Sequence, residues 1–362
     1  YKRQPLWGLL FSGEVSLSSI RISLDAMGGD HGPSVVVPAA ALALKERPHL
    51  SFRFFGDQDK INALLTPDLK RASEVIHTDI VITSDEKPSA AIRRKGSSMH
   101  LAIQDVDKGA SDCVISAGNT GALMANAKLI LRMLPGIDRP AIATMLPSTT
   151  GRTVTLDLGA NLEVDANNLV EFAIMGACFA KAAMGIERPT VGILNIGSED
   201  TKGHEYLQDA AAILEETTSL PGEFVGFVEG NQITGGGVDV IVTDGFTGNV
   251  ALKTAEGVGK FIAKVLKEEF SRNFLSKIAY MGAMFVMKRT KKRIDPREYN
   301  GAMFLGLSQI CIKSHGSADA FSFSRAILVG AGMAENNFNK MVGAQIEKLH
   351  AANPAPAEAA AQ

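Results

Sequence analysis

The stretch IRISLDAMGGDHGPSVVVPAAALALKER, residues 20–47, contains the structural unit that decides the fold. Its first six residues form a short apolar and β-branched run typical of a strand. PSVVVPAAALALKER (33–47) supplies apolar residues at helical spacing. The Gly- and Asp-rich segment between them provides a tight turn, because glycine adopts backbone conformations closed to other residues. The stretch therefore predicts one βα unit of a parallel sheet.

The same alternation continues along the chain. Long helix-like segments separate further strand-like runs, and this rhythm is typical of βαβ architecture. The runs are LSFRFFG (50–56), DIVIT (79–83), DCVISAG (112–118), TVTLDLG (153–159), TVGILNIG (190–197), FVGFVEG (224–230) and DVIVTDG (239–245). We predict an α/β fold, with a Rossmann-like, mostly parallel sheet and flanking helices.

Polar and glycine residues collect directly after five of the predicted strands. They form DAMGGDHGP (25–33), SAGNTGA (116–122), DLGAN (157–161), NIGSED (195–200) and DGFTGN (244–249). In an open parallel sheet the carboxyl ends of the strands share one edge, where ligands bind and helix N-termini offer N–H groups to anions. We therefore expect these five junctions at one edge of the sheet, around an anion.

Composition is that of a globular protein and excludes several classes. The 362 residues are 46% hydrophobic and 21% charged, and 37 basic against 39 acidic residues give a net charge of −2, so no general attraction to nucleic acid is expected. Cys113, Cys178 and Cys311 are too few and too widely spaced for a disulfide framework, which favours a reducing, cytoplasmic location. No run is long and apolar enough to span a membrane.

The two termini differ from the rest of the chain. Residues 1–19 are predicted to be a disordered leader, since the ordered pattern begins abruptly at Ile20. The Ala- and Pro-rich end predicts a disordered tail over 346–362. Between them, 20–345 is predicted to form a single α/β domain.

Common catalytic motifs are missing from the sequence. It contains no GxxxxGK[ST] phosphate loop, HExxH helix, GxSxG elbow or true GxGxxG fingerprint, and GAGMAE (330–335) fails the last pattern. The seven histidines lack metal-ligand spacing. We therefore expect neither a metal nor a cofactor. An anion-binding transferase without a covalent nucleophile remains compatible with these residues.

Taken together and in order, the motifs resemble those of the PlsX-type phosphate acyltransferases over about residues 20–332. The resemblance is carried by LDAMGGDHGP (24–33), EKPSAAIRRKGSSM (86–99), SAGNTGALMA (116–125), LPGIDRPA (134–141), LDLGAN (156–161), LNIGSEDTKG (194–203), DGFTGNVALKTAEG (244–257), REYNGAMFLGL (297–307) and IKSHGSADA (312–320).

The resemblance implies a reaction and an assembly. A long-chain acyl group passes from acyl-acyl carrier protein to inorganic phosphate, and the acyl phosphate feeds phospholipid synthesis in bacteria. It also implies a phosphotransacetylase-like or isopropylmalate-dehydrogenase-like architecture, a homodimer, and delivery of product to a membrane-bound glycerol-phosphate acyltransferase.

Candidate site residues follow from these motifs. Ionised phosphate needs positioning and partial neutralisation rather than a strong base, and the thioester oxyanion needs hydrogen-bond donors. Catalytic candidates are Lys95, Asn195, Lys202 and His315. Candidates for binding substrate or phosphate are Asp25, Gly28, Gly29, Asp30, Arg94, Ser97, Ser98, Ser116, Asn119, Thr120, Asp157, Asn161, Asp244, Thr247, Gly248 and Asn249. Tight turns and helix capping by Asp, Ser and Asn are the purely structural alternative for several of them.

Two positions depart from the family pattern. His100 stands where an arginine commonly follows SSM, which argues against a permanent charge there. GANLEVDANNL (159–169) lacks the cysteine of the family's GANVDC form, which argues against an essential thiol at this place.

The segment 266–293 combines an apolar, Met-rich stretch with basic residues at Lys288, Arg289, Lys291, Lys292 and Arg293. We predict a protruding helical segment that lies on an anionic membrane surface, forms a dimer interface, or does both.

Alternative functions also stay open. They are a short-chain acyl-CoA phosphotransacetylase, a metal- and NAD-dependent decarboxylating dehydrogenase, and a non-catalytic acyl-ligand or membrane scaffold.

Overall fold

The computed structural model describes residues 19–352. For residues 291 and 292 within this range it describes the backbone only. The predicted leader, apart from its last residue, and the part of the predicted tail after residue 352 lie outside the described residues. Residues 346–352 were wrongly assigned to that tail. They continue helix α13 (Phe338–Ala352), in which Ile346 and Leu349 are buried in the core. The segment QIEKLH carries apolar residues at helical spacing, which pack into the core and extend the helix up to the Ala- and Pro-rich end.

A single eleven-stranded sheet runs through the molecule, in the order β3-β2-β1-β4-β11-β10-β5-β6-β9-β7-β8. In that order the strands are Ser73–His77, Leu50–Gly56, Ile20–Asp25, Cys113–Ser116, Ile310–Lys313, Ala302–Leu305, Ala141–Pro147, Arg152–Leu156, Val240–Val242, Thr190–Leu194 and Glu223–Val228. Strand β10 is antiparallel to β11 and β5, and β5 is antiparallel to β6. All other neighbours are parallel, which confirms the predicted mostly parallel sheet.

Strand direction reverses near the middle of the sheet. Three successive antiparallel pairings separate β11 from β6, so β6, β9, β7 and β8 run opposite to β1, β4 and β11 in the hydrogen-bonded ladder. The expectation of one common carboxyl edge for all five junctions is therefore wrong. DAMGGDHGP and SAGNTGA follow one parallel set, whereas DLGAN, NIGSED and DGFTGN follow the other.

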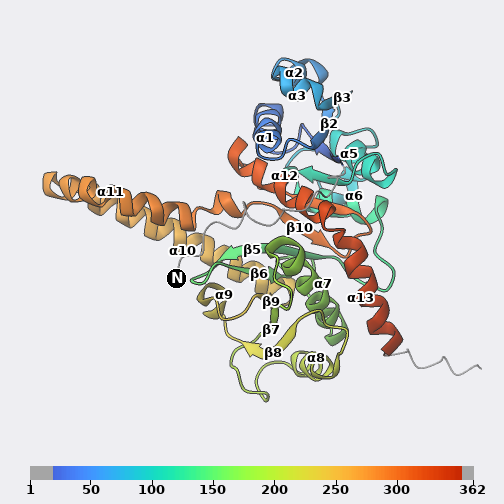
Figure 1. Ribbon diagram of the computed structural model, residues 1–362, viewed down its shortest axis with the longest axis vertical. Coiled ribbons are helices and arrows are strands. Elements are labelled where there is room, and N and C mark those ends of the chain that lie inside the picture. The colour runs from blue at the N-terminus through green and yellow to red at the C-terminus, as the bar shows by residue number, and fades with distance from the viewer. Residues whose placement is uncertain (1–18, 353–362) are drawn as a thin grey trace, which may run out of the picture.

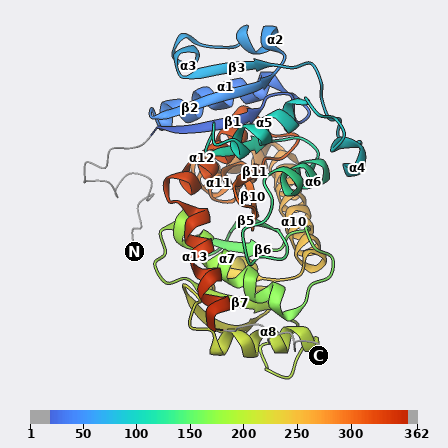
Figure 2. The same cartoon turned by 90° about the vertical axis from the view of Figure 1, so that its right-hand side faces the viewer.

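Helices cover both faces of the sheet (Figures 1 and 2). Around β4 the faces are told apart by alternation: Cys113 and Ile115 pack into the main core, and Val114 packs into a second core. The helices are α1 Pro33–Glu46, α2 Gln58–Asn62, α3 Pro67–Arg71, α4 Pro88–Ala91, α5 Ser98–Asp107, α6 Thr120–Ile130, α7 Ala166–Met184, α8 Glu205–Glu216, α9 Gln232–Gly235, α10 Gly245–Ser271, α11 Phe274–Ile294, 3-10 helix η1 Pro296–Tyr299, α12 Ala320–Glu335 and α13.

The predicted strand at 79–83 is absent from the sheet. Its backbone serves a loop instead, since Ser98 N donates to Ile80 O at 3.0 Å. The edge strand is the preceding SEVIH segment, β3. Strands β3, β5, β10 and β11 were not predicted. β10 and β11 have only four residues each and no clear alternation to mark them.

Helices α10 and α11 form a hairpin that projects from the body of the molecule (Figure 1). The protruding helical segment predicted at 266–293 is thus confirmed, although its first helix begins at Gly245. The rings of Phe270 and Tyr280 meet across the hairpin, with centroids 5.2 Å apart. No helix among residues 19–352 has an apolar stretch long enough to cross a membrane.

Candidate active site

Asp25 lies at the end of β1 and is fully buried. Its two oxygens accept hydrogen bonds of 2.6 Å from Ser98 Oγ and Ser116 Oγ. Burial raises the pKa of this carboxyl, while the two hydroxyls and the backbone of Met27 and Gly28 act to lower it. We call Asp25, Ser98, Ser116 and the nearby Lys313 the Asp25 cluster.

Glycines allow the loops around Asp25 to approach one another. A Cβ on Gly28 would lie 2.5 Å from Asp25 Oδ2 and 2.9 Å from Gly118 N. Gly29 has a φ of 82°, and a Cβ there would lie 2.9 Å from Gly316 O. The adjacent Asp30 N donates to Gly316 O at 2.9 Å. Close backbone packing therefore requires the two glycines that the sequence singled out.

Lys313 is a member of this cluster that sequence reasoning missed. Its Nζ donates to Ala117 O at 3.3 Å and to Ser314 O. Burial lowers the pKa of this ammonium to about 8, although Asp25 and Asp30 act in the opposite direction. A lysine at the end of the apolar run ICIK was the available signal.

His315 lies next to the Asp25 cluster on an exposed loop. Asn300 positions it, since His315 N donates to Asn300 Oδ1 at 3.0 Å and Asn300 Nδ2 donates to Ser314 Oγ at 2.7 Å. Ring atom Nδ1 accepts from Ser317 N at 3.3 Å. In the neutral ring the proton therefore lies on Nε2, which can donate to a substrate oxygen.

The first-half candidates Ser97 and Asn119 are helix caps. Ser97 Oγ caps α5 by accepting from His100 N at 3.3 Å. Asn119 Oδ1 caps α6, and its Nδ2 donates to Ser84 O and Glu86 O, while Thr120 is the exposed first residue of that helix. The side-chain polar atoms of Ser97 and Asn119 are thus engaged in helix capping and in hydrogen bonds to a loop.

The cations of the same region differ in exposure and pairing. Arg94 and Lys95 are both exposed, and Arg94 pairs with Glu86 at 2.6 Å. His100 is buried, and its Nδ1 lies 3.2 Å from Asn126 Oδ1. It is therefore a packing residue between α5 and α6 rather than a surface cation.

Asp157 organises the second group of candidates. Its Oδ1 accepts from the backbone amides of Ile142, Gly159 and Ala160 at 2.9, 3.2 and 3.0 Å. Its Oδ2 accepts from Asn161 N and Nδ2 at 2.8 and 2.9 Å. With both oxygens saturated, Asp157 fixes the DLGAN loop.

The DGFTGN junction packs onto that loop. Gly245 N donates to Asn161 O at 2.7 Å, and a Cβ on Gly248 would lie 1.9 Å from Asp157 O. Asp244 caps α10 by accepting from Thr247 N at 2.8 Å. The side chains of Thr247 and Asn249 are left exposed at the start of this 27-residue helix.

Asn195 fixes the loop that carries Lys202. Its Nδ2 donates to Lys202 O at 3.0 Å and its Oδ1 accepts from Ile196 N at 2.8 Å. The side chain of Lys202 is exposed. This loop lies near the start of α10, because it follows β7, which pairs in parallel with β9, the strand that α10 follows.

Most of the predicted residues thus form two groups. Asp25, Gly28, Gly29, Asp30, Ser98, Ser116 and His315 surround β1, β4 and β11, and Asp157, Asn161, Asn195, Lys202, Asp244, Thr247, Gly248 and Asn249 surround β6, β7 and β9. Within each group, carboxylates and amides hold the loops. The exposed lysines, His315 and Asn249 remain available to a substrate.

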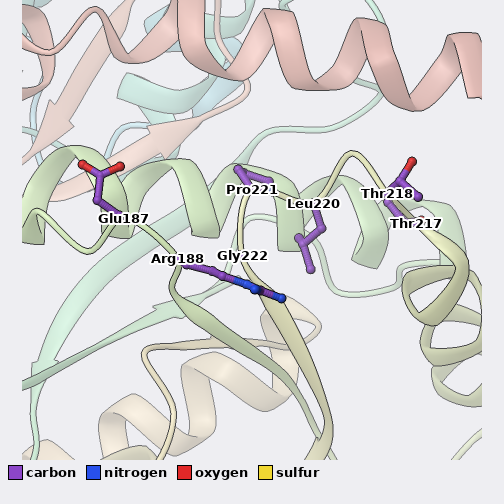
Figure 3. A pocket seen from close by; sticks show the side chains of 7 residues that line it. All are labelled: Glu187, Arg188, Thr217, Thr218, Leu220, Pro221 and Gly222. Carbon is purple, nitrogen blue, oxygen red and sulfur yellow. The ribbon is translucent and has the colours of Figure 1, made fainter.

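Two surface cavities lie elsewhere. One, of about 540 Å³, is lined by Glu187, Arg188, Thr217, Thr218, Leu220, Pro221 and Gly222 (Figure 3). The other, of about 220 Å³, shares Thr217 and Thr218 with it. No predicted site residue lines either cavity, so the candidate site is defined by its loops.

The cysteines do not supply a nucleophile. Cys113, Cys178 and Cys311 are free and buried. Burial raises the pKa of all three thiols, that of Cys178 to about 12. Because the thiolate is the reactive form, these residues act as packing groups. Among the residues that the structure describes, no group of three or more His, Cys, Asp or Glu side chains could hold a metal ion.

Solved structures of low sequence identity share the fold. A phosphotransacetylase from Streptococcus pyogenes superposes with a TM-score of 0.59 at 18% identity, covering 87% of this chain and 94% of that one. A branched-chain phosphotransacylase from Enterococcus faecalis gives 0.55 at 13% identity, covering 87% and 99%. These likenesses confirm the expected phosphotransacylase-type α/β architecture.

Sequence relatives are much closer. Residues 20–341 match the family described as "Fatty acid synthesis protein". A phosphate acyltransferase from Paramagnetospirillum magneticum is 48% identical, covering 95% of this chain and 99% of that protein. One from Afipia carboxidovorans is 52% identical, covering 87% and 90%. By sequence and by fold, the chain belongs to the PlsX-type phosphate acyltransferases of the fatty acid synthesis protein family.

Proposed function

We infer that this enzyme transfers a long-chain fatty acyl group from acyl-acyl carrier protein to inorganic phosphate. Family membership across nearly the whole chain carries the proposal, since it supports acyl transfer to phosphate. The carrier-bound donor and the supply of acyl phosphate to phospholipid synthesis are the finer parts of the proposal.

The reaction suits a site without a covalent nucleophile. A phosphate oxygen attacks the thioester carbonyl carbon and forms a tetrahedral oxyanion, which collapses with cleavage of the C–S bond. One positioned hydrogen-bond donor to such an oxyanion is worth about 2.7–4 kcal/mol in a studied hydrolase. His315 is a candidate donor, because its Nδ1 accepts from Ser317 N and leaves Nε2–H for a substrate.

Lys202, Lys95 and the start of α10 are our candidates for phosphate. Both lysines are exposed, and Thr247 and Asn249 add a hydroxyl and an amide at the N-terminus of a long helix. Anions are stabilised there by the helix dipole and by positioned donors. Asp25, Asp157 and Asn195 hold the loops that carry these groups and the glycines.

Formation of acyl phosphate tests the proposal. Purified protein is given a C16 acyl-acyl carrier protein, with or without phosphate, and acyl phosphate is trapped as hydroxamate. The phosphate-free reaction corrects for hydroxylamine acting on the thioester itself. Phosphate-dependent hydroxamate is expected. Product only from a short-chain acyl-CoA would favour a phosphotransacetylase, and no product from any donor would favour the non-catalytic scaffold.

We also infer a homodimeric, cytoplasmic enzyme that touches the membrane surface through the α10–α11 hairpin. The hairpin exposes many large apolar side chains to solvent, and large exposed apolar patches mark interaction surfaces. They are Phe246, Val250, Val258, Phe261, Ile262, Val265, Leu266, Phe274, Leu275, Ile278, Tyr280, Met281, Met284, Phe285, Val286 and Ile294. Contact there would pass the poorly soluble product to a membrane-bound glycerol-phosphate acyltransferase.

A further inference from the structure

The ammonium of Lys313 has more N–H donors than hydrogen-bond acceptors around it. Its ammonium is held by two carbonyl oxygens, Ala117 O and Ser314 O, at the ends of the adjacent parallel strands β4 and β11. An ammonium has three N–H donors. The third has no partner within residues 19–352, and the side chain is partly exposed beside the loop of His315. The ammonium is therefore held in place by two carbonyl oxygens, and one N–H donor stays available to a substrate.

The charges around Lys313 disfavour a phosphate dianion. The groups that act on it are Asp25 at the end of β1, Asp30 in the following loop, and Cys311 on its own strand. The charges of two carboxyl groups act on this one ammonium, so a doubly charged anion gains little there. A neutral group that becomes negative only during the reaction suits this place better. In a thioester transfer that group is the leaving sulfur.

The reaction has a need that this arrangement can meet. In the tetrahedral intermediate either the phosphate or the thiolate can leave. The phosphate dianion and the thiolate of an alkyl thiol, whose pKa is about 8.5, are both competent leaving groups. Without help the intermediate therefore collapses in both directions. Protonation of the sulfur as the C–S bond breaks would direct its collapse toward acyl phosphate.

We propose that Lys313 is the general acid that protonates the departing sulfur. This rests on the proposed acyl transfer to phosphate. As the oxyanion re-forms the carbonyl, the C–S bonding pair moves to sulfur and takes a proton from Nζ. The products are acyl phosphate, the free carrier thiol and a neutral lysine, which regains its proton from water. Asp25 and Asp30 hold the ammonium form between turnovers, and the pKa of about 8 lies close to that of the thiol it serves.

Leaving-group dependence separates proton donation from a merely structural role. Lys313→Met, Lys313→Arg and the exposed control Lys340→Met are compared using an alkyl thioester and an aryl thioester of the same acyl chain. For Lys313→Met we expect about a 10²-fold loss of kcat with the alkyl thioester, typical of a lost general acid. The aryl thiolate leaves unaided, so its loss should be under about tenfold. Lys313→Arg should resemble Lys313→Met, because a guanidinium keeps its proton.

The wild-type enzyme provides a test that does not depend on the variants folding. From pH 7 to about pH 9.5, kcat/KM for the alkyl thioester should fall through an apparent pKa near 8, as the acid loses its proton. The aryl thioester should show no such fall.

Each outcome has one meaning. Equal losses for both thioesters in Lys313→Met, rescue by Lys313→Arg, or equal pH profiles for the two thioesters would overturn the proposal. If the wild-type enzyme makes no acyl phosphate at all, the proposed function fails instead.

Discussion

Ser116 Oγ donates a 2.6 Å hydrogen bond to Asp25 Oδ2 and so ties together the ends of the neighbouring parallel strands β4 and β1. Ser98, at the start of α5, binds the other carboxylate oxygen. The loops after these strands carry the glycines of the Asp25 cluster. A small buried network thus determines where the loop backbones lie.

Ser116→Ala should destabilise the protein by about 1.5–3 kcal/mol at pH 7, because it removes a hydrogen bond to a buried carboxylate. The Ser116 hydroxyl lowers the pKa of Asp25, so its loss should raise that pKa further. A higher pKa of Asp25 in the folded protein means that protonation of this carboxyl stabilises the folded state more. The loss in unfolding free energy should therefore be smaller at pH 4 than at pH 7. Urea unfolding at both pH values measures this, with the exposed Ser271→Ala as control. Equal losses at both pH values would contradict the assignment.

Gly248→Ala and Gly257→Ala should have opposite effects, although both lie in α10. A Cβ on Gly248 meets the Asp157 carbonyl oxygen at 1.9 Å, whereas nothing lies within 4 Å of one on Gly257. We expect a loss of about 3 kcal/mol or more at Gly248, typical of severe strain, and a gain of about 0.5–1 kcal/mol at Gly257. Thermal unfolding distinguishes them. A stable Gly248→Ala variant would show that the DLGAN loop yields easily.

Glu171→Gln should stabilise the protein at pH 8 and have little effect at pH 5. Burial in α7 raises the pKa of Glu171 to about 7 in the folded state, so its contribution to stability is lost as pH rises from about 4.5 to 7. Full conversion of that shift gives about 3 kcal/mol, which partial solvent screening reduces to about 1–2 kcal/mol. Urea unfolding at the two pH values, with the exposed Glu347→Gln as control, tests the sign. Stabilisation at pH 5 alone would refute it.

Lys202→Met should raise KM for phosphate by about 10–100-fold, the equivalent of one lost charge-assisted hydrogen bond. The thioester KM should change much less. Saturation curves for each substrate provide the measurement, and Lys108→Met, at an exposed position after α5, is the matched control. An unchanged KM for phosphate would remove Lys202 from the phosphate site.

Replacing Lys288, Arg289, Lys291 and Lys292 with Gln should weaken binding to vesicles that contain anionic lipid, at about 1 kcal/mol per charge near the surface. Turnover of a soluble thioester should be unchanged, because the hairpin projects away from the body of the enzyme (Figure 1). Arg293 is kept, since it donates to Thr149 O at the base of the hairpin. Vesicle flotation measures the effect, and unchanged flotation would defeat the membrane proposal.

Much of the fold could be predicted because strands and helices follow local periodicity. The runs at Ile20–Asp25 and Leu50–Gly56 have the predicted bounds, and α7 begins at the residue after Asp165, which caps it. The four-residue strands β10 and β11 could not be predicted, because their formation depends on neighbours far away in sequence. The reversal of strand direction at β10 and β5 escaped prediction for the same reason.

For the site, the sequence by itself determined which motifs matter, since turns, caps and close approaches require Gly, Asp, Ser and Asn at fixed places. Only the tertiary structure decided what each side chain does there. It shows that the polar atoms of Asp157 and Asn195 form hydrogen bonds that fix loops. It also shows that Lys313 is anchored by two carbonyl oxygens, in the electric field of Asp25 and Asp30. The physical reason is that hydrogen-bond partners, burial and electric field are set by groups distant in sequence, which no local pattern encodes.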